Sequence, residues 1–129
     1  MIKNESERKI ENVCNLGYLS DTMGGKKHLI EEIIDIFLKQ IPEELQTINE
    51  AIEKTNYPVI KSFAHTMKST VSIMGISVLT PILLEMENLG AKATDIERIK
   101  ELNLKLTLIC KQAIAEIERE KHKMLNTKN

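Results

Sequence analysis

The sequence predicts an all-α protein, an antiparallel up-down four-helix bundle with an additional N-terminal helix. Apolar residues recur at spacings of three and four along several long stretches, which is the period of an amphipathic helix. No stretch shows a clear alternation with period two, the pattern of a half-buried strand. Leu, Ile, Met, Glu and Lys dominate a composition that favours helices, and aromatic residues make up only 3%. A chain of 129 residues is long enough for one domain with a substantial core.

The first part of the chain contains three expected elements. A short helical turn begins near Val13 and ends at Met23-Gly24-Gly25, because paired glycines break a helix. A long helix is expected over residues 26–41, and its buried side consists of Leu29, Ile30, Ile33, Ile34, Phe37 and Ile41. Proline is disfavoured inside a helix but tolerated in a first turn, so Pro42 predicts a break at residues 40–42 and a second helix over 42–54.

Three further helices follow from caps and periodicity. Asn56 and Pro58 suit the start of a helix that runs to about Met74 and ends at Gly75. Its expected inner side is Ile60, Ala64, Met67, Val71 and Met74. The next helix begins around residues 77–81, capped by Ser77 or Thr80, and ends at Leu89-Gly90. A capping box of Thr94 and Glu97 opens the last helix, over about residues 95–121.

Amphipathic helices with short connections bury their apolar sides most simply in an antiparallel up-down bundle. The helix over 26–41 is then the additional one, which caps or extends one end. We expect residues 1–12 to be a flexible segment, 13–123 to form the bundle and 124–129 to be a flexible tail. No heptad repeat or large unpaired apolar face demands a dimer, so a monomer is expected.

Composition excludes several classes of function. A net charge of −1 without a basic stripe argues against nucleic-acid binding. No apolar run approaches the roughly 20 residues of a membrane span, and the charged N-terminus is not a signal peptide, so we expect a cytoplasmic protein.

Cys14 and Cys110 have no metal or redox spacing and are expected to be reduced thiols packed as small hydrophobic residues. His28 and His122, flanked by lysines, are interpreted as solvated, and no metal or cofactor is expected. Without a glycine-rich phosphate loop the chain lacks an ATP site and is not expected to be an enzyme of its own.

His65 stands in a polar row on the helix over residues 58–74. Four small or cationic residues lie three, four or seven positions from it and therefore share its face: Lys61, Lys68, Ser69 and Ser72. An imidazole has an ordinary pKa of about 6.5 and is a usable nucleophile at neutral pH. A lysine one turn away could offset the charge of a phosphoryl group placed on the ring. The alternative is an ordinary surface histidine.

The residues around His65 resemble a known signature. Ala64-His65-x-Met67-Lys68-Ser69, with Gly75 following, is similar to the Ala-His-x-Leu-Lys-Gly-Ser pattern and later glycine of histidine phosphotransfer (HPt) domains of two-component phosphorelays. Leu79, Leu83 and Met86-Glu87 resemble the next stretch of the family, and Ile36-Phe37-Leu38 and Pro42-Glu43 resemble the preceding one. The resemblance runs from about Asn15 into the 120s. Ser69 departs from it, since the family often has glycine there, where a partner's backbone comes close.

The resemblance implies a four-helix bundle that acts as a phosphorelay intermediate. His65 would accept a phosphoryl group from a receiver-domain aspartate and pass it to another receiver, with Lys68 stabilising the phosphoryl oxygens. Lys61, Ser69, Ser72 and Glu87 would form or border the docking face; Glu87 would orient the ring or a bound water. The implied partners are response-regulator receiver domains, which would supply Mg²⁺, and a histidine kinase. For Lys61 and Glu87 the alternative is a solvated charge on a helix surface.

Residues before Val13 and over 16–25 resemble the tails of hybrid sensor kinases, which implies the C-terminal domain of such a kinase; a standalone protein stays open. Two other functions stay open as well. One is a helical protein-interaction module in which His65 is incidental. The other is an enzyme such as an autophosphorylating kinase or a phosphatase, and the missing nucleotide motif argues against the kinase.

Overall fold

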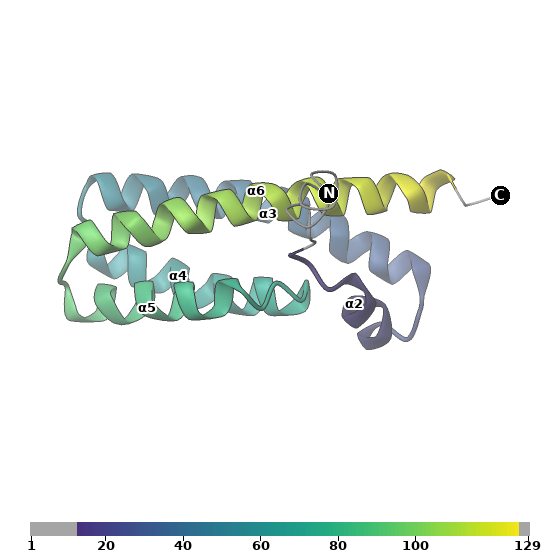
Figure 1. Ribbon diagram of the computed structural model, residues 1–129, viewed down its shortest axis with the longest axis horizontal. Helices are drawn as coiled ribbons and strands as arrows, with labels where there is room; N and C mark the ends of the chain where they lie inside the picture. Colours follow the sequence, from purple (N-terminus) through teal and green to yellow (C-terminus); the bar gives the residue numbers. More distant parts are fainter. Residues whose placement is uncertain (1–12, 127–129) are drawn as a thin grey trace, which may run out of the picture.

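The computed structural model describes residues 13–126, which form five α-helices and no strand (Figure 1). The helices are α2 (Leu16–Thr22), α3 (Lys27–Glu53), α4 (Tyr57–Ile73), α5 (Leu79–Lys92) and α6 (Ile96–Asn126). The predicted flexible segment 1–12 lies outside the described residues, as do the last three residues of the predicted tail.

The four long helices form an antiparallel bundle, and the predicted fold class is confirmed. Each helix packs against two neighbours, in the cyclic order α3, α4, α5, α6, so α4 and α6 lie diagonally opposite. The first turns of α3 and the last turns of α6 extend beyond the α4–α5 pair, and the short helix α2 lies beside α3 at this end (Figure 1). The additional N-terminal helix is therefore α2 and not the segment over 26–41.

The predicted break at Pro42 is wrong, because α3 runs without interruption from Lys27 to Glu53. Proline inside a helix costs about 3 kcal/mol. Pro42 is exposed, so its missing backbone donor and its ring lie on the solvent side. The buried side stays in register across it through Ile34, Phe37, Ile41, Leu45 and Ile48. Burying a large aliphatic side chain contributes roughly 1.5–3 kcal/mol, so packing on both sides of Pro42 outweighs the local cost.

Other predicted boundaries differ from the structure in small ways. The backbone N–H of Arg98 donates to Asp95 Oδ1 at 3.3 Å, so Asp95 caps α6 in place of the predicted Thr94. Helix α6 continues to Asn126, beyond the predicted end at residue 121, and Met124 packs against the core. At the start of α5 neither Ser77 nor Thr80 caps the helix, since its N-cap is Val78 without a side-chain bond.

The start and the inner side of α4 agree with the prediction. Asn56 Oδ1 accepts a hydrogen bond from the backbone N–H of Val59 at 3.3 Å, and Pro58 lies in the first turn. The predicted inner residues are all fully buried: Ile60, Ala64, Met67, Val71 and Met74. This buried stripe fixes which residues of α4 face solvent, and His65 is among them.

Residues 13–15 connect α6 to the end of α4. The buried carboxylate of Glu116 accepts hydrogen bonds from the backbone N–H groups of Val13 at 2.7 Å and Cys14 at 3.0 Å. The backbone N–H of Asn15 donates to the carbonyl oxygens of Met74 and Gly75. Gly75 ends α4, as predicted, with a φ of +67°. A Cβ atom at Gly75 would lie 2.7 Å from Asn15 Cβ, so glycine also permits this close crossing.

Both thiols are free and lie inside or against the core. Burial raises the pKa of the Cys110 thiol to about 12. Burial and, to a lesser extent, the Glu116 carboxylate raise the pKa of the Cys14 thiol well above its usual range. Thiolates are the reactive form of cysteine, so neither side chain is poised for chemistry at neutral pH.

Candidate functional site

His65 stands on the solvent side of α4, and its side chain is 69% exposed. The preceding residue, Ala64, belongs to the buried stripe, so His65 begins the outward face about 100° around the helix. An exposed imidazole on a rigid, well-packed helix is accessible to a second protein while its backbone stays fixed.

Glu87 of α5 links His65 to Lys68. Its Oε2 lies 2.7 Å from His65 Nδ1, and its Oε1 lies 2.6 Å from Lys68 Nζ. The Glu87 side chain is 16% exposed and that of Lys68 is 26% exposed, so both are more sheltered than the imidazole. The predicted one-turn separation of His65 and Lys68 is present, but in the structure the lysine contacts the imidazole's partner and not the imidazole.

The electrostatics of this group keep Glu87 ionised. The hydrogen bond with the Lys68 ammonium lowers the pKa of the Glu87 carboxyl below its ordinary value; burial opposes it with the next largest effect, and the hydrogen bond with His65 adds a smaller lowering. An ionised carboxylate can only accept, so in a neutral imidazole the proton resides on Nδ1 and points at Glu87. The lone pair of the ring is then on Nε2, the nitrogen that Glu87 does not contact.

Gly90 of α5 sets the distance between Glu87 and α4. It is buried, and a Cβ atom there would lie 3.0 Å from the backbone nitrogen of Lys61. Without a side chain at this position, α5 approaches α4 closely one turn after Glu87. The sequence pattern indicated that Gly90 ends the helix, but α5 continues to Lys92. A glycine three residues after a site carboxylate is the signal that could have indicated close packing.

An open hollow of about 590 Å³ adjoins His65 and is bordered by Pro58, Lys61, Ser62, Thr66 and Glu87. Of the predicted docking residues, Lys61 and Glu87 therefore lie at the site. Ser69 is exposed on the same side of α4 but does not line this hollow. Ser72 borders a different hollow of about 310 Å³, together with Asn15, Tyr18, Gly75, Ser77 and Thr80. The structure thus separates Ser72 from the immediate surroundings of the imidazole.

An apolar groove between α3 and α4 was not predicted. It has a volume of about 70 Å³ and is lined by Ile33, Ile36, Phe37, Gln40, Thr70, Ile73 and Met74. Ile36 and Ile73 are about half exposed. The signal in the sequence is that both isoleucines fall outside the buried stripes of their helices.

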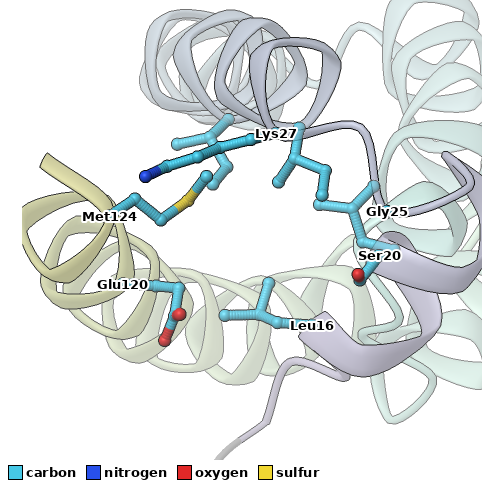
Figure 2. Close-up of a pocket in the computed structure, with 9 residues that line it drawn as sticks. Leu16, Ser20, Gly25, Lys27, Glu120 and Met124 are labelled. Atoms are coloured by element: carbon cyan, nitrogen blue, oxygen red, sulfur yellow. The ribbon is translucent and has the colours of Figure 1, made fainter. Parts of the chain in front are cut away.

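A further hollow, of about 350 Å³, lies at the far end of the bundle, between α2, the first turns of α3 and the last turns of α6. Figure 2 shows Leu16 and Ser20 of α2, Lys27 of α3, and Glu120 and Met124 of α6 around it. It shares no residue with the surroundings of His65.

Within residues 13–126 no group of three or more His, Cys, Asp or Glu side chains is placed to hold a metal ion. His28 and His122 are both exposed. In the same part of the chain, no helix is long and apolar enough to cross a membrane.

Comparison with protein families identifies the domain. The model of the Hpt domain family matches residues 32–123, a span that contains the His65 helix and Glu87. The chain belongs to the Hpt family. The histidine phosphotransfer resemblance of the sequence is thereby confirmed, and the chain has a phosphotransfer role in two-component signalling.

Two solved structures share the fold of this Hpt domain. Histidine-containing phosphotransfer protein B from Pseudomonas aeruginosa PAO1 superposes with a TM-score of 0.78 at 16% identity, over 85% of this chain and 95% of that one. The Hpt domain of a sensor hybrid histidine kinase from Shewanella gives a TM-score of 0.75 at 16% identity, over 86% and 95% of the two chains. No curated protein sequence matches the chain.

Proposed function

We propose that this Hpt domain is a phosphorelay intermediate. Nε2 of His65 accepts a phosphoryl group from the aspartyl phosphate of one receiver domain and passes it to the aspartate of another. The observation that carries the proposal is the 2.7 Å contact between His65 Nδ1 and Glu87 Oε2 on an exposed imidazole. This contact holds the ring and leaves the nucleophilic nitrogen turned away from its own protein.

The chemistry requires little of this chain beyond that orientation. The lone pair of Nε2 attacks phosphorus in line with the bond to the aspartate oxygen; the N–P bond forms as the P–O bond breaks, and the aspartate leaves as a carboxylate. Nδ1 keeps its proton, so the ring gains positive charge, which the Glu87 carboxylate stabilises. Transfer to the second receiver reverses these steps.

Lys68 has two roles in this proposal. Its contact with Glu87 keeps the carboxylate ionised, which maintains the reactive tautomer of His65. It also lies one helical turn from His65, where its charge offsets that of phosphoryl oxygens on the ring. Lys68 therefore acts on the imidazole mainly through Glu87 before transfer and on the phosphoryl group after it.

The docking face is proposed to extend over the outward side of α4. Lys61 and Glu87 adjoin the imidazole, Ser69 and Ser72 are exposed farther along the helix, and Ile36 and Ile73 add an apolar patch on the α3 side. Receiver domains, and a histidine kinase upstream, are the expected cytoplasmic partners. The receiver holds Mg²⁺ and supplies most of the transition-state stabilisation, and this chain needs no nucleotide site.

The test is phosphotransfer from a receiver domain charged with acetyl phosphate, comparing the wild type with His65→Gln. We expect label on the wild type alone, with the acid-labile, base-stable behaviour of phosphohistidine. Circular dichroism confirms that the variant is folded. Label retained by His65→Gln, or none on the wild type from several charged receivers, would contradict the proposal. In the interaction-module alternative, His65→Gln keeps its affinity for the partner and its function.

A further inference from the structure

The outward face of α6 carries two leucines that the fold leaves uncovered. Leu104 and Leu108 are each 68% exposed, more than any other large apolar side chain described in residues 13–126. They lie four residues apart and therefore on consecutive turns of one face. The core of α6 is complete without them, through Ile99, Leu102, Leu106, Cys110, Ala113 and Ile117.

Two charges of opposite sign, Glu101 and Lys111, flank this leucine pair at its two ends; Lys100, also one turn before Leu104, is already paired with Glu97. Glu101 is one turn before Leu104, and Lys111 is nearly one turn after Leu108, and both share the outward face. Glu101 is exposed and uses Oε1 for its bond with Arg98, which leaves Oε2 for another partner. Lys111 is exposed and has no ion pair among the described residues. Lys105 lies beside the pair, but its charge acts on Glu85 of the neighbouring helix α5.

We infer that this face binds a second copy of the chain, with the two α6 helices antiparallel around a two-fold axis. The axis passes midway between Leu104 and Leu108, so each leucine faces the other residue of the pair on the partner copy. The same symmetry places Glu101 of one copy at the height of Lys111 of the other, twice. In a parallel pair, Glu101 would face Glu101 and Lys111 would face Lys111, so charge selects the antiparallel arrangement.

The site around His65 stays open in this dimer. Helices α4 and α6 are diagonally opposite in the bundle, so their outward faces point in different directions. The dimer therefore presents two exposed imidazoles on its outer sides, and its formation does not depend on phosphotransfer. From the sequence we expected a monomer instead, because two leucines are too few to show a heptad repeat.

The experiment is sedimentation equilibrium of the full chain over about a hundredfold range of concentration, because a small interface gives a weak, concentration-dependent dimer. We expect Leu104→Glu to raise the dimer dissociation constant at least about tenfold, since it buries a charge in the seam. Leu84→Glu, at another exposed leucine on α5, is the matched control and keeps the wild-type constant. Circular dichroism confirms that each variant is folded.

A charge exchange tests the antiparallel register. Lys111→Glu weakens the antiparallel dimer, because both of its ion pairs become repulsive, and adding Glu101→Lys restores it. In a parallel dimer Lys111→Glu only exchanges one like-charge pair for another. A wild type that stays monomeric, a Leu104→Glu chain that associates normally, or a Lys111→Glu chain of unchanged affinity each overturns the inference. All these variants keep transfer to His65, so failure here is distinct from failure of the proposed relay role.

Discussion

Glu87 turns an ordinary surface histidine into one with a defined tautomer. Without a carboxylate at Nδ1, the proton of a neutral imidazole is shared between the two ring nitrogens, and the ring rotates freely at an exposed position. The contacts of Glu87 with both His65 and Lys68 remove that freedom before any partner arrives. Orientation of this kind lowers the barrier because the partner does not have to select a rare arrangement.

Replacing Glu87 should therefore slow transfer without unfolding the protein. We expect Glu87→Ala to reduce the rate of phosphoryl transfer to His65 about tenfold, because both the fixed tautomer and the stabilising charge are lost. Nitrogen NMR of the imidazole should show a mixture of tautomers in place of the Nδ1–H form. Glu85→Gln is the control, since Glu85 lies two residues away on α5 but binds Arg98 of α6. Equal transfer rates for the wild type and Glu87→Ala would show that Glu87 does not contribute to the reaction.

Glu44, unlike Glu87, has a carboxyl group whose charged form is disfavoured by its surroundings. Its Oε1 is buried without a hydrogen-bond partner, and burial, with the neighbouring Glu43 charge, raises the pKa of the carboxyl. A raised pKa in the folded state means that stability is fully present below the ordinary carboxyl pKa and is lost as the pH rises through the folded-state value. At neutral pH the charged form therefore destabilises the fold.

Glu44→Gln is expected to raise the unfolding temperature at pH 7 by roughly 2 °C, since it removes the buried charge. The gain should shrink towards pH 4, where the wild-type carboxyl is itself protonated. Thermal unfolding across this pH range measures it, and Glu32→Gln, at an exposed position of the same helix, serves as the control. A gain that does not vary with pH would show that the carboxyl charge is not its cause.

At the scale of the element, burial of the inner side of α3 outweighs the tendency of Pro42 to break the helix. If Pro42 is merely tolerated on the solvent side, Pro42→Ala should increase the free energy of unfolding by about 1–3 kcal/mol, because it restores a backbone donor and removes a ring clash. Urea unfolding measures this, and transfer to His65 should be unchanged. Destabilisation would instead indicate that a bend at Pro42 is needed for the curvature of α3.

Gly24 after α2 and Gly75 after α4 have similar positive φ angles, so comparing them separates backbone strain from crowding by neighbouring atoms. Gly24 and Gly75 have φ values of +65° and +67°, but a Cβ at Gly24 meets nothing within 4 Å, whereas one at Gly75 would overlap Asn15. Gly24→Ala should cost about 1–2 kcal/mol of stability, the left-handed backbone term alone. Gly75→Ala should cost clearly more in urea unfolding, because residues 13–15 must also move. Equal costs would mean that the crossing of Asn15 adapts freely.

At the scale of the whole molecule, Glu116 of α6 attaches the segment before α2 to the bundle. Its carboxylate is the shared acceptor for Val13 and Cys14, and α2 follows directly after them. We expect Glu116→Gln to speed amide hydrogen exchange in residues 13–25 while α4 and α5 keep their protection, since an amide oxygen accepts less strongly than a carboxylate. Glu118→Gln, exposed on the same helix, is the control. Uniform loss of protection would show that Glu116 supports the entire core.

The sequence predicted the buried faces of the helices better than the contacts between helices. The stripe of α4 followed from apolar spacing, because periodicity depends only on residues that are near in the chain. The break at Pro42 was wrong because a local rule ignored packing from other helices. The resemblance placed Glu87 at the border of the site, but the pairing of Lys68 with Glu87 depends on how closely α5 approaches α4, which Gly90 sets. The groove beside Ile36 and Ile73 likewise exists only once α3 and α4 are packed.

His65 is exposed on the surface of α4, beside an open hollow. Its exposed neighbours on α4, including Lys61, Ser62, Ser69 and Ser72, alternate with the residues that build the core. Surface substitutions of this kind usually change stability by no more than about 0.5 kcal/mol. On the docking face that we propose, substitutions at these positions therefore change the choice of partner while His65, Glu87 and the core stay the same.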